Sequence, residues 1–163
     1  MCGGMFLRQW REYRTAEKNH QDLMEMVLTE PSFPSESPGA DPVEKIPHID
    51  FEALKEINPQ IVGWLYLPDT IISYPVVQGE DNSYYLKHLL DGTENSSGCP
   101  FLDSRCNGLQ GKNSVIYGHY MKNDTLFAPL KEYQNQEYYE AHPTIFLIRP
   151  EETLTIQLFS AYI

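Results

Sequence analysis

The fold class is decided by the stretch Gly63-Trp64-Leu65-Tyr66-Leu67-Pro68-Asp69-Thr70-Ile71-Ile72-Ser73-Tyr74-Pro75-Val76-Val77. Its two apolar and aromatic runs flank a turn-type break, which predicts two neighbouring strands. Further strands are expected at Pro100–Asp103, Ser114–Tyr117, Thr144–Ile148 and Leu154–Ile163, and helical segments at Tyr84–Leu90 and Leu126–Tyr133. Many short strands with occasional helices favour a mainly β fold with peripheral helices. We therefore expect a β-barrel or a mostly antiparallel sheet, and not a doubly wound α/β fold.

The globular domain is expected to begin near residue 48. Asp50 is placed to cap a short helix that carries Phe51, Leu54 and Ile57 on one face, and Asn58-Pro59 ends that helix. Residues 31–47 contain five prolines, which remove backbone donors and prevent regular structure, so we interpret them as a linker. The predicted organisation is an N-terminal helix at 1–30, a proline-rich linker at 31–47 and a β domain at 48–163.

The N-terminal segment has the periodicity of an amphipathic helix. One stripe contains Phe6, Trp10, Tyr13, Glu17, His20, Met24 and Val27. The favoured interpretation is that this stripe docks on the domain or on a partner helix, and the alternative is a membrane-proximal role.

Composition excludes several classes of protein. The 163 residues carry a formal net charge of −11, so counterion release from phosphates cannot drive nucleic-acid binding. With 41% hydrophobic residues and 12% aromatics the chain is typical of a globular protein. We find no apolar run of the length of a membrane span and no signal peptide. Three cysteines, Cys2, Cys99 and Cys106, form no C-x-x-C pair, so we expect no zinc, no other metal and no cofactor.

His119 is the histidine best placed for chemistry. Val115-Ile116-Tyr117 is an apolar strand that delivers Gly118-His119 to its end, where a sheet can present a side chain to a cleft. The other four histidines are expected to be structural or solvated: His20, His48, His88 and His142.

Four segments in order resemble class B sortases. The run Asn113-Ser114-Val115-Ile116-Tyr117-Gly118-His119-Tyr120-Met121-Lys122, followed by Leu126-Phe127 and Leu130, resembles the catalytic-histidine segment of that family. The run from Phe51 to Trp64 resembles its entry helix and first strand. Asp81-Asn82-Ser83-Tyr84-Tyr85-Leu86 is similar to its substrate-groove segment, and Leu158-Phe159-Ser160-Ala161-Tyr162 to one of its later strands. The resemblance covers residues 48–163.

The resemblance implies a sortase-type barrel and a cysteine transpeptidase of Gram-positive cell surfaces. In the family, a cysteine thiolate attacks a backbone carbonyl of a sorting signal, here expected to be of the Asn-Pro type. An amine of a peptidoglycan precursor then resolves the thioester, which attaches a surface protein to the cell wall. His119 is implied as the catalytic histidine, and Asn82, Leu86 and Tyr117 as substrate-binding groove residues.

The chain also departs from the family pattern. Cys99 and Cys106 precede His119 and do not match the nucleophile segment, so we interpret them as buried or loop thiols. Arg105 and Arg149 do not match the family's arginine and are expected on the surface.

The family's cysteine and arginine are expected after Ile163, and its membrane anchor before a helix that Trp10-Arg11-Glu12-Tyr13-Arg14 resembles. We therefore expect a fragment, shortened at both ends, that is inactive alone and reaches a membrane only through a missing anchor. The alternatives are a non-catalytic peptide-binding module and a structural or adhesive β-domain.

Overall fold

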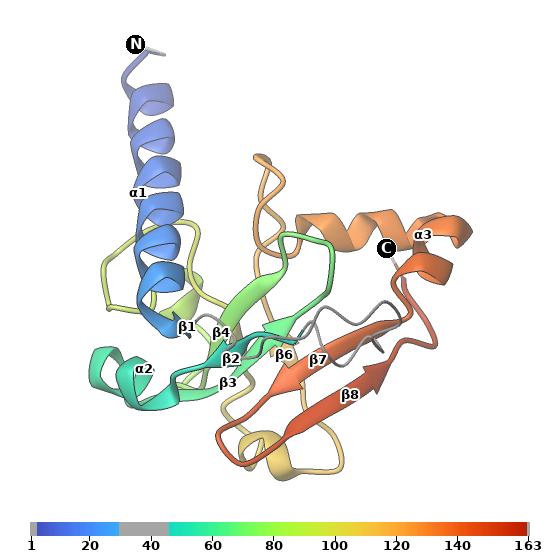
Figure 1. The fold of residues 1–163 in the computed structure, drawn as a ribbon. Helices are drawn as coiled ribbons and strands as arrows, with labels where there is room; N and C mark the ends of the chain where they lie inside the picture. The colour runs from blue at the N-terminus through green and yellow to red at the C-terminus, as the bar shows by residue number, and fades with distance from the viewer. Residues whose placement is uncertain (1–2, 30–45, 163) are drawn as a thin grey trace.

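A curled six-stranded sheet forms the centre of the molecule, with helices around it (Figure 1). The computed structural model describes residues 3–29 and 46–162. The sheet has the strand order β6-β5-β4-β3-β7-β8, and β1 and β2 form a separate pair. The strands are β1 (Leu28–Thr29), β2 (His48–Ile49), β3 (Ile61–Tyr66), β4 (Ser73–Val77), β5 (Phe101–Leu102), β6 (Ile116–Tyr117), β7 (Thr144–Ile148) and β8 (Thr153–Gln157). The helices are α1 (Gly3–Val27), α2 (Phe51–Ile57), α3 (Gln136–Ala141) and the 3₁₀ segments η2 (Tyr84–Leu86), η3 (Gly108–Gln110) and η4 (Ala128–Gln134).

The β3–β4 hairpin is present as predicted. Trp64 lies opposite Pro75, and Leu65 opposite Tyr74, in an antiparallel ladder. The turn is closed by Thr70, whose hydroxyl donates to the carbonyl of Leu67. β3 also pairs with β7, which makes it a central strand. The mainly β fold with peripheral helices is therefore confirmed.

Alternate residues of β3 enter two different hydrophobic clusters, as the period of a strand requires. Trp64 is completely buried and packs in a cluster with residues of α1 and α2, including Leu23 and Leu54. Leu65 packs on the other face in a cluster that includes Leu126 and Leu147. The central strand thus joins the N-terminal helices to the part of the sheet that carries β6.

α2 follows the predicted capping pattern. A side-chain oxygen of Asp50 accepts hydrogen bonds from the backbone N–H groups of Glu52 and Ala53, both at 3.0 Å. The carboxylate satisfies two of the donors that a helix start leaves unpaired. Leu54 is buried, and the helix ends at Asn58.

The helix predicted at Tyr84–Leu90 is wrong. Only the 3₁₀ turn Tyr84–Leu86 forms, because the chain then pairs with the segment that follows it. The Leu89 N–H donates to the carbonyl of Thr93, and the Asn95 N–H donates to that of Lys87. These hydrogen bonds to the following eight residues replace the helical ones.

Several further boundaries differ from the prediction. The strands expected at Pro100–Asp103 and Ser114–Tyr117 are shortened to Phe101–Leu102 and Ile116–Tyr117. The expected helix at Leu126–Tyr133 is the 3₁₀ helix Ala128–Gln134, followed by α3, which the sequence analysis did not find. The expected strand at Leu154–Ile163 ends at Gln157 in the structure. The pairing of β4 with β5 is parallel, and it places the start of β5 beside the end of β4.

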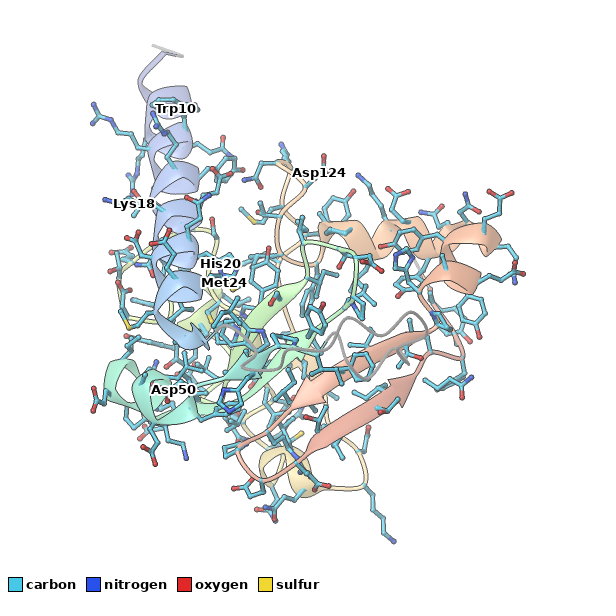
Figure 2. The ribbon with its side chains drawn as sticks, viewed as in Figure 1. Trp10, Lys18, His20, Met24, Asp50 and Asp124 are labelled. Carbon is cyan, nitrogen blue, oxygen red and sulfur yellow. The ribbon has the colours of Figure 1, made fainter. Side chains whose placement is uncertain are left out.

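The fully buried contacts of α1 come from its C-terminal half, and Tyr13 in its N-terminal half packs partly buried against the second cluster. Leu23 and Val27 are buried, whereas Trp10 is 54% exposed and carries the guanidinium of Arg14 over its ring at 4.8 Å. Figure 2 shows Trp10 near the far end of the helix and His20 on the side that faces the domain. The expected stripe therefore docks in part. In the part of the chain that the structure describes, no helix is long and apolar enough to cross a membrane. The linker predicted at 31–47 lies almost wholly outside the described residues.

The α1 contact is expected to weaken in acid. Burial lowers the pKa of His20 to about 4 from an ordinary value of 6.5. The His20 ring packs against the tilted ring of Tyr74, with the ring centroids 4.6 Å apart, and the adjoining cavity is also lined by Glu17 and Cys99. Because the pKa of His20 is lower in the folded protein, the unfolded chain takes up this proton at a higher pH. The contribution of His20 to stability should therefore be constant above about pH 6.5 and fall from there towards pH 4. Thermal unfolding across this pH range should show the decline. The variant His20→Phe should lack the part of the decline that comes from protonation of His20. An identical pH profile for the variant would contradict the expectation.

Candidate active site

His119 lies two residues beyond the end of β6, on a loop whose two ends are hydrogen-bonded to each other. The N–H of Phe127 donates to the carbonyl of His119 at 3.1 Å, and Tyr120 and Leu126 form an isolated antiparallel bridge. Gly118 precedes the histidine because a Cβ there would lie 2.5 Å from the Phe127 ring. The aromatic ring therefore packs directly on the backbone beside His119. The prediction that a strand end presents this histidine agrees with its position in the structure.

The imidazole is oriented by a backbone carbonyl on another segment. Nε2 of His119 lies 2.8 Å from the carbonyl oxygen of Leu86. Because a carbonyl oxygen only accepts hydrogen bonds, Nε2 must carry the proton in this pair. In the neutral ring Nδ1 then holds the lone pair, so it is the nitrogen able to take and return a proton.

The turn that supplies this carbonyl is held from both ends. A carboxylate oxygen of Asp81 accepts from the hydroxyl and N–H of Ser83 and from the N–H of Tyr84. The hydrogen bond from the Ser83 hydroxyl is the main reason that the pKa of Asp81 is lowered. The buried Tyr85 hydroxyl accepts from Asn58 at 2.8 Å and donates to Gln60 at 2.5 Å. These contacts fix the turn on the core, and they thereby fix the Leu86 carbonyl that binds His119.

Gly98 brings a second backbone segment against the same turn. Its φ is +62°, and a Cβ there would lie 2.3 Å from the carbonyl oxygen of Tyr85 and 3.0 Å from that of Leu86. The adjacent N–H of Cys99 donates to the Tyr85 carbonyl at 3.0 Å. Only glycine adopts this backbone conformation without cost and leaves room for the approach.

A buried carboxylate organises the residues beside the histidine. Asp103 is 2% exposed and receives two hydrogen bonds from the guanidinium of Arg105, at 2.9 and 2.7 Å. The Tyr117 hydroxyl donates to the same carboxylate at 3.0 Å. The pKa of Asp103 is far below its usual range, mainly because of the Arg105 side chain. Asp103 thus remains ionised and holds Tyr117 in a fixed position two residues before His119.

The four residues implied as a site lie on two facing segments. Asn82 accepts from the N–H of Ser104 at 2.8 Å, which ties it to the strand end that carries Asp103. Leu86 contacts His119 through its carbonyl, and its side chain is 36% exposed. Tyr117 is also 36% exposed. Segment 82–86 therefore faces segment 117–119. The hydrogen bond between His119 and the Leu86 carbonyl joins the two segments at one end.

Sequence reasoning missed three contributors to this geometry. These are the Leu86 carbonyl, the Asp103 carboxylate and the close approach at Gly98. The Asp-x-Arg pair of Asp103 and Arg105, at the end of the strand predicted at Pro100–Asp103, is a signal that could have identified Asp103. The backbone contributors leave no such signal, because they depend on pairings between distant segments.

The cysteines agree with the interpretation as buried or loop thiols. Cys99 is buried, and burial raises the pKa of its thiol to about 12. Cys106 lies in a loop, with Sγ 3.9 Å from the carbonyl of Asn113. A thiol that does not ionise near neutral pH is a poor nucleophile, which excludes Cys99 from that role. Cys2 lies outside the described residues.

One of the two arginine expectations is wrong. The side chain of Arg105 is 82% exposed, although it is paired with Asp103. The side chain of Arg149 is only 10% exposed, because it donates to the carbonyl of Leu109 and pairs with Glu152. Arg149 therefore serves to join η3 to the β7–β8 turn. Among residues 3–29 and 46–162, no group of three His, Cys, Asp or Glu side chains is arranged to hold a metal ion.

His88 and His142 have partners other than His119. His88, expected in a helix, instead forms an isolated bridge with Glu94 and stacks on Tyr84 at 3.9 Å. His142 ends α3 and lies 3.1 Å from the carbonyl of Tyr138.

The sequence is similar to two curated sortases. It is 37% identical over 110 residues to Sortase B of Listeria monocytogenes, which covers 67% of this chain and 45% of that protein. It is 38% identical over 114 residues to Sortase B of Staphylococcus aureus, which covers 69% of this chain and 46% of that protein. The chain thus spans about half the length of the curated relatives it matches. No protein-family model matches it.

The fold is similar to solved sortase B structures. Sortase B from B. anthracis, in complex with AAEK1, matches with a TM-score of 0.72 and 30% identity over 96% of this chain and 69% of that chain. Clostridium perfringens sortase B matches with a TM-score of 0.66 and 39% identity over 69% of this chain and 62% of that one. A Staphylococcus aureus sortase B–substrate complex matches with a TM-score of 0.65 and 38% identity, over 69% of this chain and 52% of that one. The resemblance inferred from the four segments is confirmed, and the chain belongs to the sortase B family.

Proposed function

We propose that residues 1–163 form the histidine-bearing part of a class B sortase transpeptidase. The enzyme would cleave an Asn-Pro-type sorting signal and join the released carboxyl end to an amine of a peptidoglycan precursor at the cell surface. The observation that carries the proposal is the fixed hydrogen bond between His119 Nε2 and the Leu86 carbonyl, at 2.8 Å. It holds the imidazole in one tautomer, with Nδ1 left for proton transfer.

In the proposed reaction His119 moves protons and the family's cysteine forms the covalent bond. The thiolate adds to the scissile carbonyl carbon, and the leaving amine departs with a proton that Nδ1 supplies. The neutral ring then takes a proton from the incoming precursor amine as that amine displaces the thiolate from the thioester. The Nε2–H bond to Leu86 persists through both steps, because that nitrogen is protonated in both forms of the ring.

The peptide is proposed to lie along segments 82–86 and 117–119. The half-exposed side chain of Leu86 offers an apolar contact, and the ring of Tyr117 offers an aromatic one that Asp103 holds in place. Asn82 stands at the far end of the same pair of segments. A similar Staphylococcus aureus sortase B has been solved as a complex with substrate, which supports a peptide site in this family.

A polypeptide of residues 1–163 alone is proposed to be inactive. Of its two described cysteines, Cys99 is buried, and that burial raises the pKa of its thiol. Cys106 lies against Asn113, on a different loop from His119. The test extends the chain with a class B sortase segment that carries the family's cysteine and arginine. Mass spectrometry should then detect a thioester with an Asn-Pro-type signal peptide on the added cysteine. A thioester on Cys99 or Cys106 of the unextended chain would overturn the proposal, and so would peptide binding without any cleavage by the extended protein.

Leu86→Ala is expected to separate substrate binding from nucleophile activation. In the extended protein it should lower kcat/KM for the signal peptide about tenfold, because a partly buried leucine contact is lost. Labelling of the nucleophile by a small thiol reagent should stay unchanged, since the backbone carbonyl that orients His119 remains. The exposed neighbour supplies a control, Lys87→Ala, which should alter neither quantity. Equal loss of turnover and labelling in Leu86→Ala would contradict the assignment.

A further inference from the structure

We propose that α1 is a positioning element for His119, because it binds both of the segments that together fix the imidazole. One is the loop 119–127, which carries the histidine. The other is segment 84–99, which supplies the carbonyl that receives its Nε2–H. The inference rests on the proposed role of His119 and adds a function for a helix that lies outside the β domain.

The first set of contacts joins α1 to the loop that carries the histidine. Asn123 donates from its side chain to a carboxylate oxygen of Glu17 at 3.2 Å. One turn further along α1, the ring of His20 packs against that of Tyr74, whose hydroxyl accepts from the N–H of Leu126 at 3.2 Å. α1 therefore contacts this loop once directly and once through a β4 side chain.

The second set joins α1 to the segment that supplies the carbonyl. The side chain of Asn95 donates to the backbone carbonyl of Glu12 at 2.9 Å, and the Ser96 hydroxyl donates to the Glu12 carboxylate at 2.6 Å. Near the middle of the helix, Asn19 donates to Asp91 at 2.8 Å. Three hydrogen bonds thus connect two turns of α1 to the loop that follows η2.

Both sets end close to the histidine. On the first side, Leu126 forms a β-bridge with Tyr120, the residue directly after the histidine. On the second side, the N–H of Asn95 donates to the carbonyl of Lys87, the residue directly after the one whose carbonyl orients the imidazole. A displacement of α1 is therefore transmitted to the donor and to the acceptor of the same hydrogen bond.

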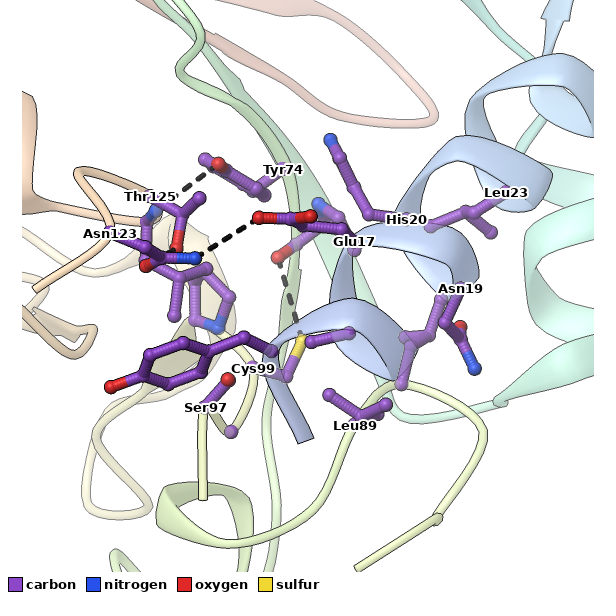
Figure 3. A pocket seen from close by; sticks show the side chains of 17 residues that line it. Glu17, Asn19, His20, Leu23, Tyr74, Leu89, Ser97, Cys99, Asn123 and Thr125 are labelled. Carbon is purple, nitrogen blue, oxygen red and sulfur yellow. Dashed lines mark hydrogen bonds between the residues drawn. The ribbon is translucent and has the colours of Figure 1, made fainter. Parts of the chain in front are cut away.

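Two of the polar residues of α1, Glu17 and Asn19, border a cavity between the helix and the domain. The cavity has a volume of about 80 Å³ and is lined by α1 together with both segments (Figure 3). Its lining includes Leu23 from α1, Leu89 and Cys99 from segment 84–99, and Leu126 from the loop 119–127. Since apolar packing is incomplete here, the hydrogen bonds of Glu17 and Asn19 carry a larger share of the attachment at the cavity, and those of Glu12 add to it one turn and more towards the N-terminus.

The test measures the histidine ring directly in the full chain, without relying on catalysis. The variant Glu12→Ala/Glu17→Ala removes one side-chain contact to each segment. Ring nitrogen shifts from NMR should show His119 as the Nε2–H tautomer in the unaltered protein and as a mixture of tautomers in the variant. Amide exchange at Phe127, which bonds to His119, should become about tenfold faster. Protection in the β3–β7 ladder should stay unchanged, which a general loss of stability would not allow.

Two matched variants control the experiment. Arg11→Ala/Lys18→Ala removes two charges from exposed positions of the same helix and should leave the ring unaltered. Glu12→Gln/Glu17→Gln keeps the hydrogen-bond acceptors and should behave as the unaltered protein, even if the alanine variant unfolds. An unaltered His119 tautomer in the folded alanine variant, an equal effect in the control pair, or no rescue by glutamine would overturn the inference. Failure of the extended protein to form a thioester would overturn the proposed function instead and leave these ring measurements unaffected.

Discussion

We expect His119→Ala to lower kcat/KM for a sorting-signal peptide about 10⁴-fold in the protein extended with the family's cysteine and arginine. Alanine removes the group that protonates the leaving amine and deprotonates the incoming one, and losses of this size are typical when a member of a catalytic triad is removed. Chromatography of cleaved peptide gives the rates, and mass spectrometry shows whether any thioester still forms.

The control is a histidine outside the site. His142 ends α3 and contacts the Tyr138 carbonyl, so His142→Asn should retain turnover while it removes an imidazole from the chain. Turnover by His119→Ala at the level of the unaltered protein would refute the catalytic assignment.

Gly98→Ala should have the largest effect on stability among single-methyl additions near the site. The new Cβ would lie 2.3 Å from the Tyr85 carbonyl oxygen in a backbone with φ of +62°. A left-handed alanine costs about 1 kcal/mol, and forcing an atom into packed backbone costs about 1–3 kcal/mol more. We therefore expect urea unfolding to show a loss of about 2–4 kcal/mol. Displacement of the turn should also break the hydrogen bond between Leu86 and His119.

Gly108 separates the two causes of this loss. Its φ is +56°, but a Cβ there meets nothing within 4 Å. Gly108→Ala should therefore cost about 1 kcal/mol, the conformational part alone. Equal losses for Gly98→Ala and Gly108→Ala would show that the close approach to Tyr85 is unimportant.

Local sequence patterns predicted the elements that depend on local interactions. The β3–β4 hairpin, the Asp50 cap of α2 and β7 were found from residues that lie next to one another in the chain. The position of His119 just after a short apolar strand was also predicted from such a window, and its catalytic role stays a prediction. In each case the pattern and the stabilising contact fall within one short window.

The errors arose where the structure depends on which other part of the chain a segment pairs with, and a local pattern does not reveal that pairing. The apolar spacing of Tyr84–Leu90 fits a helix, but pairing of Lys87 with Asn95 and of Leu89 with Thr93 draws the chain away after one 3₁₀ turn. The partner of His119 was not predicted for the same reason, since the Leu86 carbonyl lies 33 residues earlier in the chain. A backbone oxygen is present at every position, so no residue type marks the one that is used.

Because a backbone carbonyl orients His119, proton transfer and peptide selectivity are proposed to depend on different atoms of the residue at position 86. Any residue at position 86 presents the same oxygen, whereas the side chain at that position faces the proposed peptide. Specificity could therefore diverge at this position, by natural drift or by directed engineering, without disturbing proton transfer. Position 86 is thus a point at which a library of side chains would change what the protein selects and preserve how it reacts.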